Sequence, residues 1–166
     1  MLVSILSALL ATTTAAAPAK APSGLDALAW FAGDWQCTGR FADGRTIRSH
    51  ESFDMALDGH WLRMRHDDVA PGRYRAEEWW GPAPGAKGYI VTVFDNGGGL
   101  RHYASAGWNG DALALENTAG TGYIDRFDFR RLDAATYQVD YSHRDKAGAW
   151  RTGDTLRCTK PATPPR

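Results

Sequence analysis

Turn-forming residues divide most of this 166-residue chain into short segments, and this division constrains the fold more than any other feature. Glycine next to Asp or Asn recurs in "ADGR", "LDGH" and "DNGGG", and such pairs favour tight hairpin turns. Between the turns, apolar and polar residues alternate with the period of a β-strand, as at Tyr137, Val139 and Tyr141. The pattern predicts ten strands, over residues 34–41, 47–57, 60–69, 74–80, 89–95, 100–108, 112–118, 123–132, 136–144 and 149–159.

One short stretch, residues 25–31, has the apolar spacing of a helical turn. A long series of adjacent hairpins protects its edge strands best by closing on itself. We therefore predict an all-β fold over residues 25–160: a single up-and-down antiparallel β-barrel of about 8–10 strands with a short N-terminal helical turn. A sandwich of two sheets is the alternative.

The first 19 residues have the character of a signal peptide. Residues 2–11 form an uncharged apolar run, and Ala17-Pro18-Ala19 fits the small-residue cleavage motif. The run is too short to span a membrane, which takes about 20 apolar residues. We expect an exported protein, periplasmic or extracellular, with residues 20–24 as a flexible leader and the Pro-rich residues 161–166 as a disordered tail.

The two cysteines, Cys37 and Cys158, stand near opposite ends of the predicted domain. Export favours a disulfide between them, and two separate buried thiols are the alternative. If the sheet closes, the first and last strands become neighbours, so this bridge would fasten the barrel at its seam. Arg157 beside Cys158 is expected to lay its guanidinium near an indole at the barrel end.

The triplet Gly33-Asp34-Trp35 after a helical turn, together with Arg157 in the closing strand, resembles the signatures of the calycins. This superfamily includes lipocalins, fatty-acid-binding proteins and the ten-stranded nitrobindin-like barrels. The resemblance implies that Gly33, Trp35 and Arg157 are structural and close one end of the barrel. A nitrobindin-like haem site needs a histidine late in the chain, and His143 in "YSHRDK" does not fit it, so we predict no cofactor.

Charge and motifs exclude several classes of function. Lys+Arg and Asp+Glu both number 19, and this balance argues against a nucleic-acid partner. No nucleophile motif stands out, so no catalytic residue is assigned. His60 and His66 would lie ~20 Å apart along a strand, and His66 with Asp68 lacks further ligands, so no metal site is predicted.

A barrel of this size is either filled by side chains or holds one small ligand. Aromatic and apolar residues, and polar residues in phase with them, are predicted to face the interior and bind that ligand. They are Glu78, Trp80, Tyr89, Val91, His102, Asp125, Phe127, Phe129, Tyr137, Tyr141 and His143.

The function that these features favour is non-catalytic binding of a small apolar or amphipathic molecule inside the barrel. One alternative is an enzyme in which His102 or His143 pairs with Asp125 or Glu78 for acid–base chemistry. Another is a filled barrel that meets a protein partner through exposed aromatic residues at Trp79 or Trp80. The sequence leaves the oligomeric state open.

Overall fold

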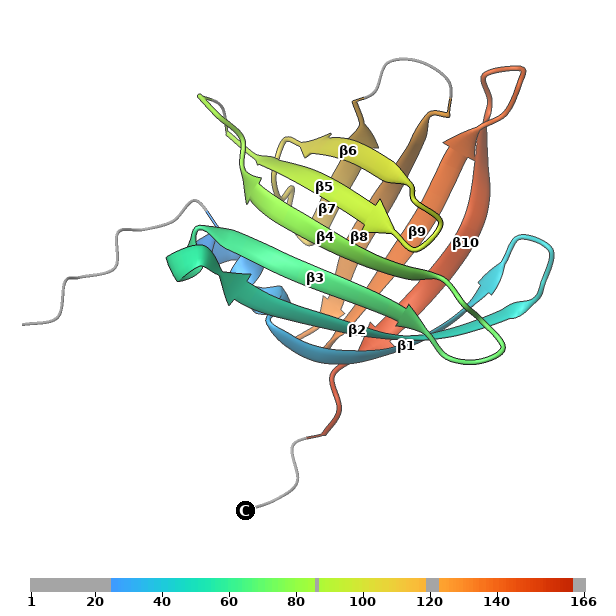
Figure 1. Ribbon diagram of the computed structural model, residues 1–166, viewed down its shortest axis with the longest axis horizontal. Coiled ribbons are helices and arrows are strands. Elements are labelled where there is room, and N and C mark those ends of the chain that lie inside the picture. The colour runs from blue at the N-terminus through green and yellow to red at the C-terminus, as the bar shows by residue number, and fades with distance from the viewer. Residues whose placement is uncertain (1–24, 86, 119–122, 163–166) are drawn as a thin grey trace, which may run out of the picture.

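The computed structural model describes residues 25–85, 87–118 and 123–162, which form a closed ten-stranded barrel (Figure 1). A 3-10 turn, η1, precedes the barrel, and a second, η2, interrupts it between β2 and β3. The elements are η1 (Asp26–Phe31), β1 (Gly33–Phe41), β2 (Thr46–Ala56), η2 (Leu57–Gly59), β3 (Trp61–Asp68), β4 (Arg75–Pro82), β5 (Tyr89–Asp95), β6 (Leu100–Ser105), β7 (Ala112–Asn117), β8 (Asp125–Asp133), β9 (Thr136–Arg144) and β10 (Trp150–Thr159).

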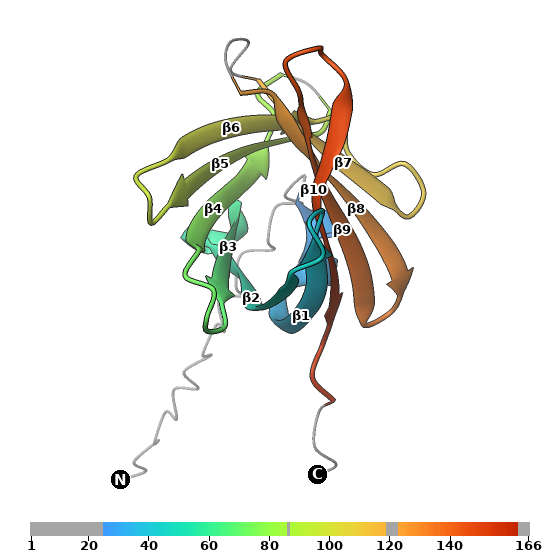
Figure 2. The same cartoon turned by 90° about the vertical axis from the view of Figure 1, so that its right-hand side faces the viewer.

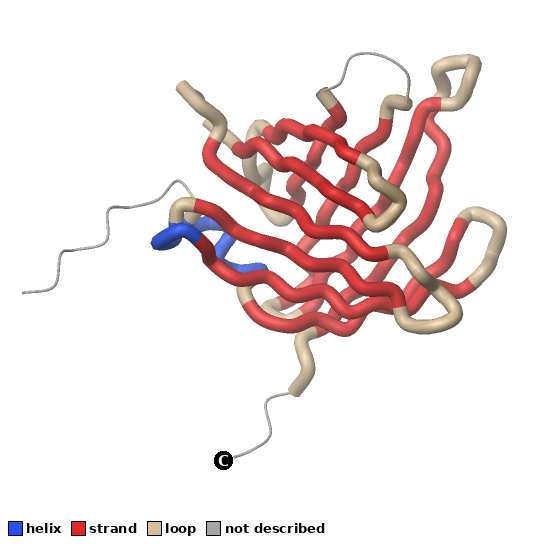
Figure 3. Tube along the Cα trace, in the orientation of Figure 1, coloured by secondary structure: helices blue, strands red, loops and turns tan. Residues whose placement is uncertain are grey.

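Every strand pairs antiparallel with its neighbours in sequence, and β1 pairs with β10 to close the ring (Figure 2). Strands make up most of the described chain, and loops and turns join them, as Figure 3 shows. The prediction of an all-β, up-and-down antiparallel barrel with a short N-terminal helical turn is therefore confirmed. A closed ring has no free edges, so the two-sheet sandwich is excluded.

The seam of the barrel lies between the first and last strands. Cys37 on β1 stands directly opposite Cys158 on β10, and the two form a disulfide. The predicted pairing is confirmed. In the chain-entropy treatment, a bridge between residues 121 positions apart stabilises the fold by about 4–5 kcal/mol.

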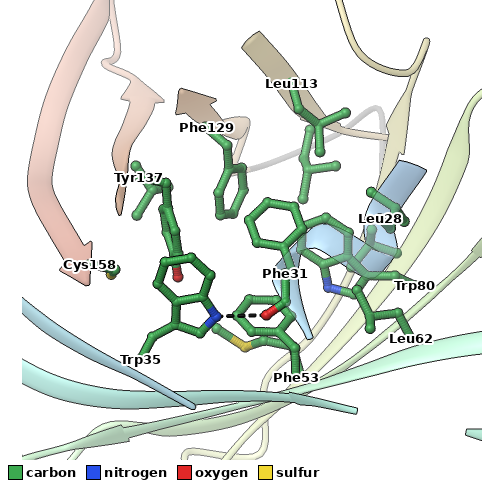
Figure 4. Packing of buried hydrophobic residues seen from close by; sticks show 14 of the residues in the cluster. Leu28, Phe31, Trp35, Phe53, Leu62, Trp80, Leu113, Phe129, Tyr137 and Cys158 are labelled. Carbon is green, nitrogen blue, oxygen red and sulfur yellow. Dashed lines mark hydrogen bonds between the residues drawn. The ribbon is translucent and has the colours of Figure 1, made fainter. Parts of the chain in front are cut away.

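The η1 turn plugs one end of the barrel. Leu25, Leu28 and Phe31 are fully buried, and the Phe31 ring stacks on Phe53 with the ring centroids 5.0 Å apart. Trp35 Nε1 donates a hydrogen bond of 2.7 Å to the Phe31 carbonyl, which ties the plug to β1 (Figure 4). The plug makes this half of the interior a packed aromatic core.

Gly33 lies at the junction between η1 and β1. Its φ of +112° is a conformation that side chains with a Cβ rarely adopt. The glycine therefore allows the chain to turn sharply from the plug into the first strand and to bring Trp35 back onto Phe31.

The cation beside Trp35 is not the one that we predicted. Leu156 and Cys158 are buried on the inner face of β10, so Arg157 between them is exposed on the outer face. The Nζ of Lys160, just beyond the strand, lies 4.8 Å from the centre of the Trp35 ring instead. The expectation for Arg157 was wrong because its alternation in the strand carries it outward.

The predicted signal peptide (residues 1–19), the leader (20–24) and the last four residues of the predicted tail (163–166) lie outside the described residues. Within the described part of the chain, the helical segments are all too short to cross a membrane.

Candidate functional site

A cavity of about 300 Å³ occupies the barrel interior away from the η1 plug. Its volume is at the lower end of the range for small-molecule sites and corresponds to about ten water molecules at ~30 Å³ each. The wall combines apolar and ionisable side chains from eight strands and the β3–β4 connection. The lining residues are Phe41, Ile47, Glu51, Met64, His66, Asp68, Tyr74, Glu78, Arg101, Phe127, Phe129, Val139, Tyr141, Asp154 and Leu156.

A second hollow, of about 560 Å³, lies between the β1–β2 and β3–β4 connections. It shares Phe41, Ile47 and Asp68 with the cavity. The two spaces therefore adjoin at this end of the barrel.

A β-bulge in β10 shapes the cavity wall. The register between β9 and β10 shifts between Thr152 and Asp154, at Gly153. A Cβ on Gly153 would lie 2.5 Å from Tyr141 Cδ1, so the tyrosine ring needs a glycine at this position. The bulge also places Asp154 in phase with the buried Leu156, so that its carboxylate lines the cavity.

His66 on β3 is held between two carboxylates of the cavity wall. Its Nδ1 lies 3.2 Å from Glu51 Oε1, and its Nε2 lies 3.0 Å from Asp68 Oδ1. Burial by itself lowers the pKa of His66, but the hydrogen bonds and charges of Glu51 and then Asp68 outweigh it and raise the pKa to about 9. The imidazole is therefore an imidazolium at neutral pH, with both N–H groups engaged.

Glu51 also accepts a short hydrogen bond from the Tyr137 hydroxyl through its other carboxylate oxygen. Both side chains are buried, and burial followed by the Glu51 charge raises the pKa of Tyr137 well above its usual value. The Tyr137 ring belongs to the aromatic core around Phe31, with the ring centroids 5.5 Å apart. This bond thus joins the packed half of the interior to the polar wall of the cavity.

Arg101 on β6 is the second cation of the wall. Its Nη2 donates to Tyr74 Oη at 2.7 Å and to Asp95 Oδ2 at 3.2 Å, and its Nη1 lies 3.7 Å from Asp125 Oδ2. The Asp125 carboxylate is fully buried and accepts hydrogen bonds from the Tyr103 and Tyr141 hydroxyls. A buried carboxylate requires such partners, and here they fix Tyr141 on the cavity wall.

Two further carboxylates, those of Glu78 and Asp154, line the cavity and are half-buried. Burial raises the pKa of Glu78 to about 7, although the hydrogen bond of 2.8 Å from Trp80 Nε1 opposes the shift. Burial likewise raises the pKa of Asp154 to about 6, against the attraction of the His66 charge. Both groups therefore change charge near neutral pH.

The structure divides the predicted ligand residues among the cavity wall, the packed core and, for the two histidines, positions away from the wall. Glu78, Phe127, Phe129 and Tyr141 line the cavity, with Asp125 buried directly behind Tyr141. A second group lies in the packed core and off the cavity wall: Trp80, Tyr89, Val91 and Tyr137.

The two histidines predicted to face the ligand are not on the cavity wall. His102 is exposed, and its ring nitrogen is 3.1 Å from the Thr92 hydroxyl on the outer face. The expectation that it faces inward was wrong, because the inward residues of β6 are Arg101, Tyr103 and Ser105. His143 stacks on Tyr123, and its Nδ1 has no hydrogen-bond partner among the described residues.

Sequence reasoning missed Glu51 and Arg101 as parts of the site. Glu51 shares the alternation of the apolar residues Ile47 and Phe53. This shared phase could have indicated that the Glu51 carboxylate faces the interior. Arg101 had no such signal, because the apolar residue beside it, Leu100, suggested that the opposite face of β6 points inward. In the structure Leu100 is 57% exposed. Of the proposed His–Asp pairs, His143 on β9 stands directly opposite Asp125 on β8, but no hydrogen bond joins them among the described residues. The histidine of the cavity wall is His66, and the presence of a cavity does not match a filled barrel.

One group of potential metal ligands comes together in the described residues: Cys37, Glu51 and Cys158. Both sulfur atoms are consumed by the disulfide, so they offer no thiolate to an ion. Asp68 does lie beside His66, as the spacing suggested, but each ring nitrogen of His66 already faces a carboxylate.

No protein-family model matches this chain, and a comparison with curated proteins finds no match. Among solved structures, a redesigned β-barrel is similar, with 11% sequence identity and a TM-score of 0.38 over 80% of this chain and 93% of that one.

Proposed function

We propose that this protein is an exported, non-catalytic barrel that holds one small amphipathic molecule in the cavity at its open end. The observation that carries the proposal is the composition of the cavity wall. Apolar side chains from β1, β2, β3, β8, β9 and β10 adjoin the ionisable groups of Glu51, His66, Glu78 and Arg101 around a space of about 300 Å³. Sites for small molecules combine an apolar lining with a few polar groups in this way.

The alternative of an acid–base enzyme has less support. A general base needs a free lone pair at working pH, whereas both His66 nitrogens face carboxylates and its pKa is raised to about 9. In the described residues, no hydrogen bond joins His102 or His143 to Asp125 or Glu78. Binding without chemical change is therefore the simpler function for this wall.

Export and the calycin resemblance belong to the same proposal. A disulfide such as Cys37–Cys158 persists in an oxidising compartment, which fits the periplasm or the extracellular space. The ten-stranded barrel with Trp35 at its plugged end fits a calycin-like protein. The exposed position of Arg157 departs from the signature, and Lys160 lies beside the indole in its place.

The test is a titration with the neutral amphipathic probe N-phenyl-1-naphthylamine, whose fluorescence rises in an apolar site. We expect saturable binding of one probe per chain. Val139→Phe, which places a ring on the cavity wall, should abolish binding, whereas Ala114→Phe on the exposed face of β7 should bind as the native chain does. No saturable signal, or equal binding by both variants, would overturn the proposal.

A further inference from the structure

The two cations of the cavity wall are already neutralised within the protein. His66 lies between Glu51 and Asp68 and contacts one oxygen of each. Two carboxylates therefore share a single imidazolium, which leaves this group of three with an excess of negative charge when both carboxylates are ionised.

Arg101 is neutralised on the other side of the wall. It contacts Asp95 at 3.2 Å and Asp125 at 3.7 Å, and it also donates to the Tyr74 hydroxyl. Two carboxylates again surround one cation. An anionic ligand would thus compete with existing ion pairs for both positive groups of the cavity.

Glu78 and Asp154 line the same cavity without a cation of their own. In the described part of the chain, the Glu78 carboxylate accepts one hydrogen bond, from Trp80 Nε1, and the Asp154 carboxylate takes part in no hydrogen bond or ion pair. Burying a charged carboxylate without a partner is unfavourable, and this burial raises the pKa values of both groups. A positive charge placed in the cavity would remove the penalty.

The aromatic part of the wall is also suited to a cation. Phe127 and Tyr141 pack with their ring centroids 5.0 Å apart, and both line the cavity together with Phe129. The face of an aromatic ring attracts a cation within about 6 Å of its centre. The same rings offer apolar area to an attached hydrocarbon.

We propose that the cavity selects amphipathic cations: a protonated amine whose ammonium group is neutralised by the carboxylates of Glu78 and Asp154, and whose apolar part packs on Phe127 and Phe129. This inference rests on the proposed function, because it names the class of ligand for the same cavity. An ammonium group has three N–H donors and no acceptor, which matches carboxylate oxygens.

The test uses three probes that share an eight-carbon chain and differ in their head group: n-octylamine, 1-octanol and octanoate. Each displaces N-phenyl-1-naphthylamine from the native protein at about pH 8, where the amine is protonated. We expect octylamine to bind about ten-fold tighter than octanol, and octanoate to bind most weakly. Glu78→Gln and Asp154→Asn should each bring the affinity for octylamine towards that for octanol, measured as the ratio of the two affinities in the same variant. Glu116→Gln, on the exposed face of β7, is the matched control and should keep the preference.

The preference for octylamine should also weaken as the pH falls from about 8 to 5, because Glu78 and Asp154 become protonated in this range. The other charged groups that act on the two carboxylates are Glu51, His66, Asp68, Arg101 and Asp140. Octanol carries no charge, so its binding over the same range reports any general change in the cavity.

The outcomes separate this inference from the proposed function. Binding of the naphthylamine probe without a preference for octylamine over octanol, or with a preference for octanoate, overturns the cation inference and leaves the binding function standing. A preference that survives in both Glu78→Gln and Asp154→Asn overturns the assignment of these carboxylates. Absence of saturable binding by the naphthylamine probe overturns both proposals, because the cation inference rests on the binding function.

Discussion

Tyr137 and Glu51 stand 86 positions apart in sequence, and a hydrogen bond from the tyrosine hydroxyl to the carboxylate joins them inside the barrel. Tyr137 belongs to the aromatic core beside the plug, and Glu51 belongs to the cavity wall. The bond therefore marks the boundary between the packed half and the hollow half of the interior.

Tyr137→Phe tests this boundary. The substitution leaves Glu51 buried with one oxygen deprived of its donor, so the free energy of unfolding should fall by about 1–3 kcal/mol. Urea denaturation at neutral pH measures the change. Tyr123→Phe, at a hydroxyl whose residue is 53% exposed, is the control and should change stability by less than about 0.5 kcal/mol. Equal effects of the two changes would contradict the structural role of the bond.

The stability of the fold should depend on His66 at alkaline pH. Its pKa in the folded state is about 9, above the usual 6.5, so its contribution is complete below about pH 6.5 and is lost as the pH rises through 9. The contribution is on the order of 3 kcal/mol. His66→Gln should be less stable than the native chain at pH 6, and this difference should shrink by pH 10. A difference that is independent of pH would show that the imidazolium charge is not responsible.

Glu78→Gln should stabilise the empty protein. Burial raises the pKa of Glu78 from 4.5 to about 7, so the native chain loses stability as the pH rises through this interval. The glutamine keeps an oxygen that can accept from Trp80 Nε1 but carries no charge. At pH 8 we expect a gain on the order of 1–3 kcal/mol, which disappears by pH 4. Thermal unfolding at the two pH values measures it, and a loss of stability at pH 8 would contradict the electrostatic reading.

The disulfide at the seam should make a large contribution to the free energy of unfolding. Replacing Cys37 and Cys158 together by alanine should lower the free energy of unfolding by about 4–5 kcal/mol in the chain-entropy treatment. Reducing agent added to the native chain should reproduce the loss and leave the double variant unaffected. A double variant as stable as the native chain would show that the hydrogen bonds between β1 and β10 hold the seam alone.

Removing the plug side chain Phe31 should open the packed end. Phe31 is fully buried and contacts the rings of Phe53, Trp80 and Phe129, so Phe31→Ala should lower the free energy of unfolding by about 3–5 kcal/mol. Leu57→Ala, at a residue 64% exposed, is the control for an apolar truncation. Chemical denaturation of both variants measures the difference, and similar small losses would argue against the plug.

The fold could be predicted from local signals because hairpin turns and strand alternation are properties of short segments. The glycine-containing turns at residues 43–44 and 97–99 and the alternation of Tyr137, Val139 and Tyr141 indicated a meander, and closure followed from the need to protect its edges. The cysteine positions then pointed to the seam, and Cys37 does pair with Cys158.

The candidate site could be predicted only in part, since alternation reveals which residues share a face but not which face is inside. In β6 the apolar Leu100 indicated one face as the inner one, whereas Arg101 and Tyr103 lie there. In β10 the bulge at Gly153 reverses the phase, so Trp150 is 36% exposed although its spacing from Leu156 predicts burial.

The sequence by itself indicated the strands and their antiparallel order, the N-terminal helical turn and the disulfide, because each depends on neighbouring residues or on the order of strands along the chain. Only the structure showed that the helical turn plugs the barrel. Tertiary structure alone decided that Glu51, His66 and Asp68 meet, and that Glu78 and Asp154 line one cavity without a cation. These groups come from strands whose relative stagger around the barrel is set by the packing of the whole ring. Their charges and pKa values follow from that packing, which no single segment contains.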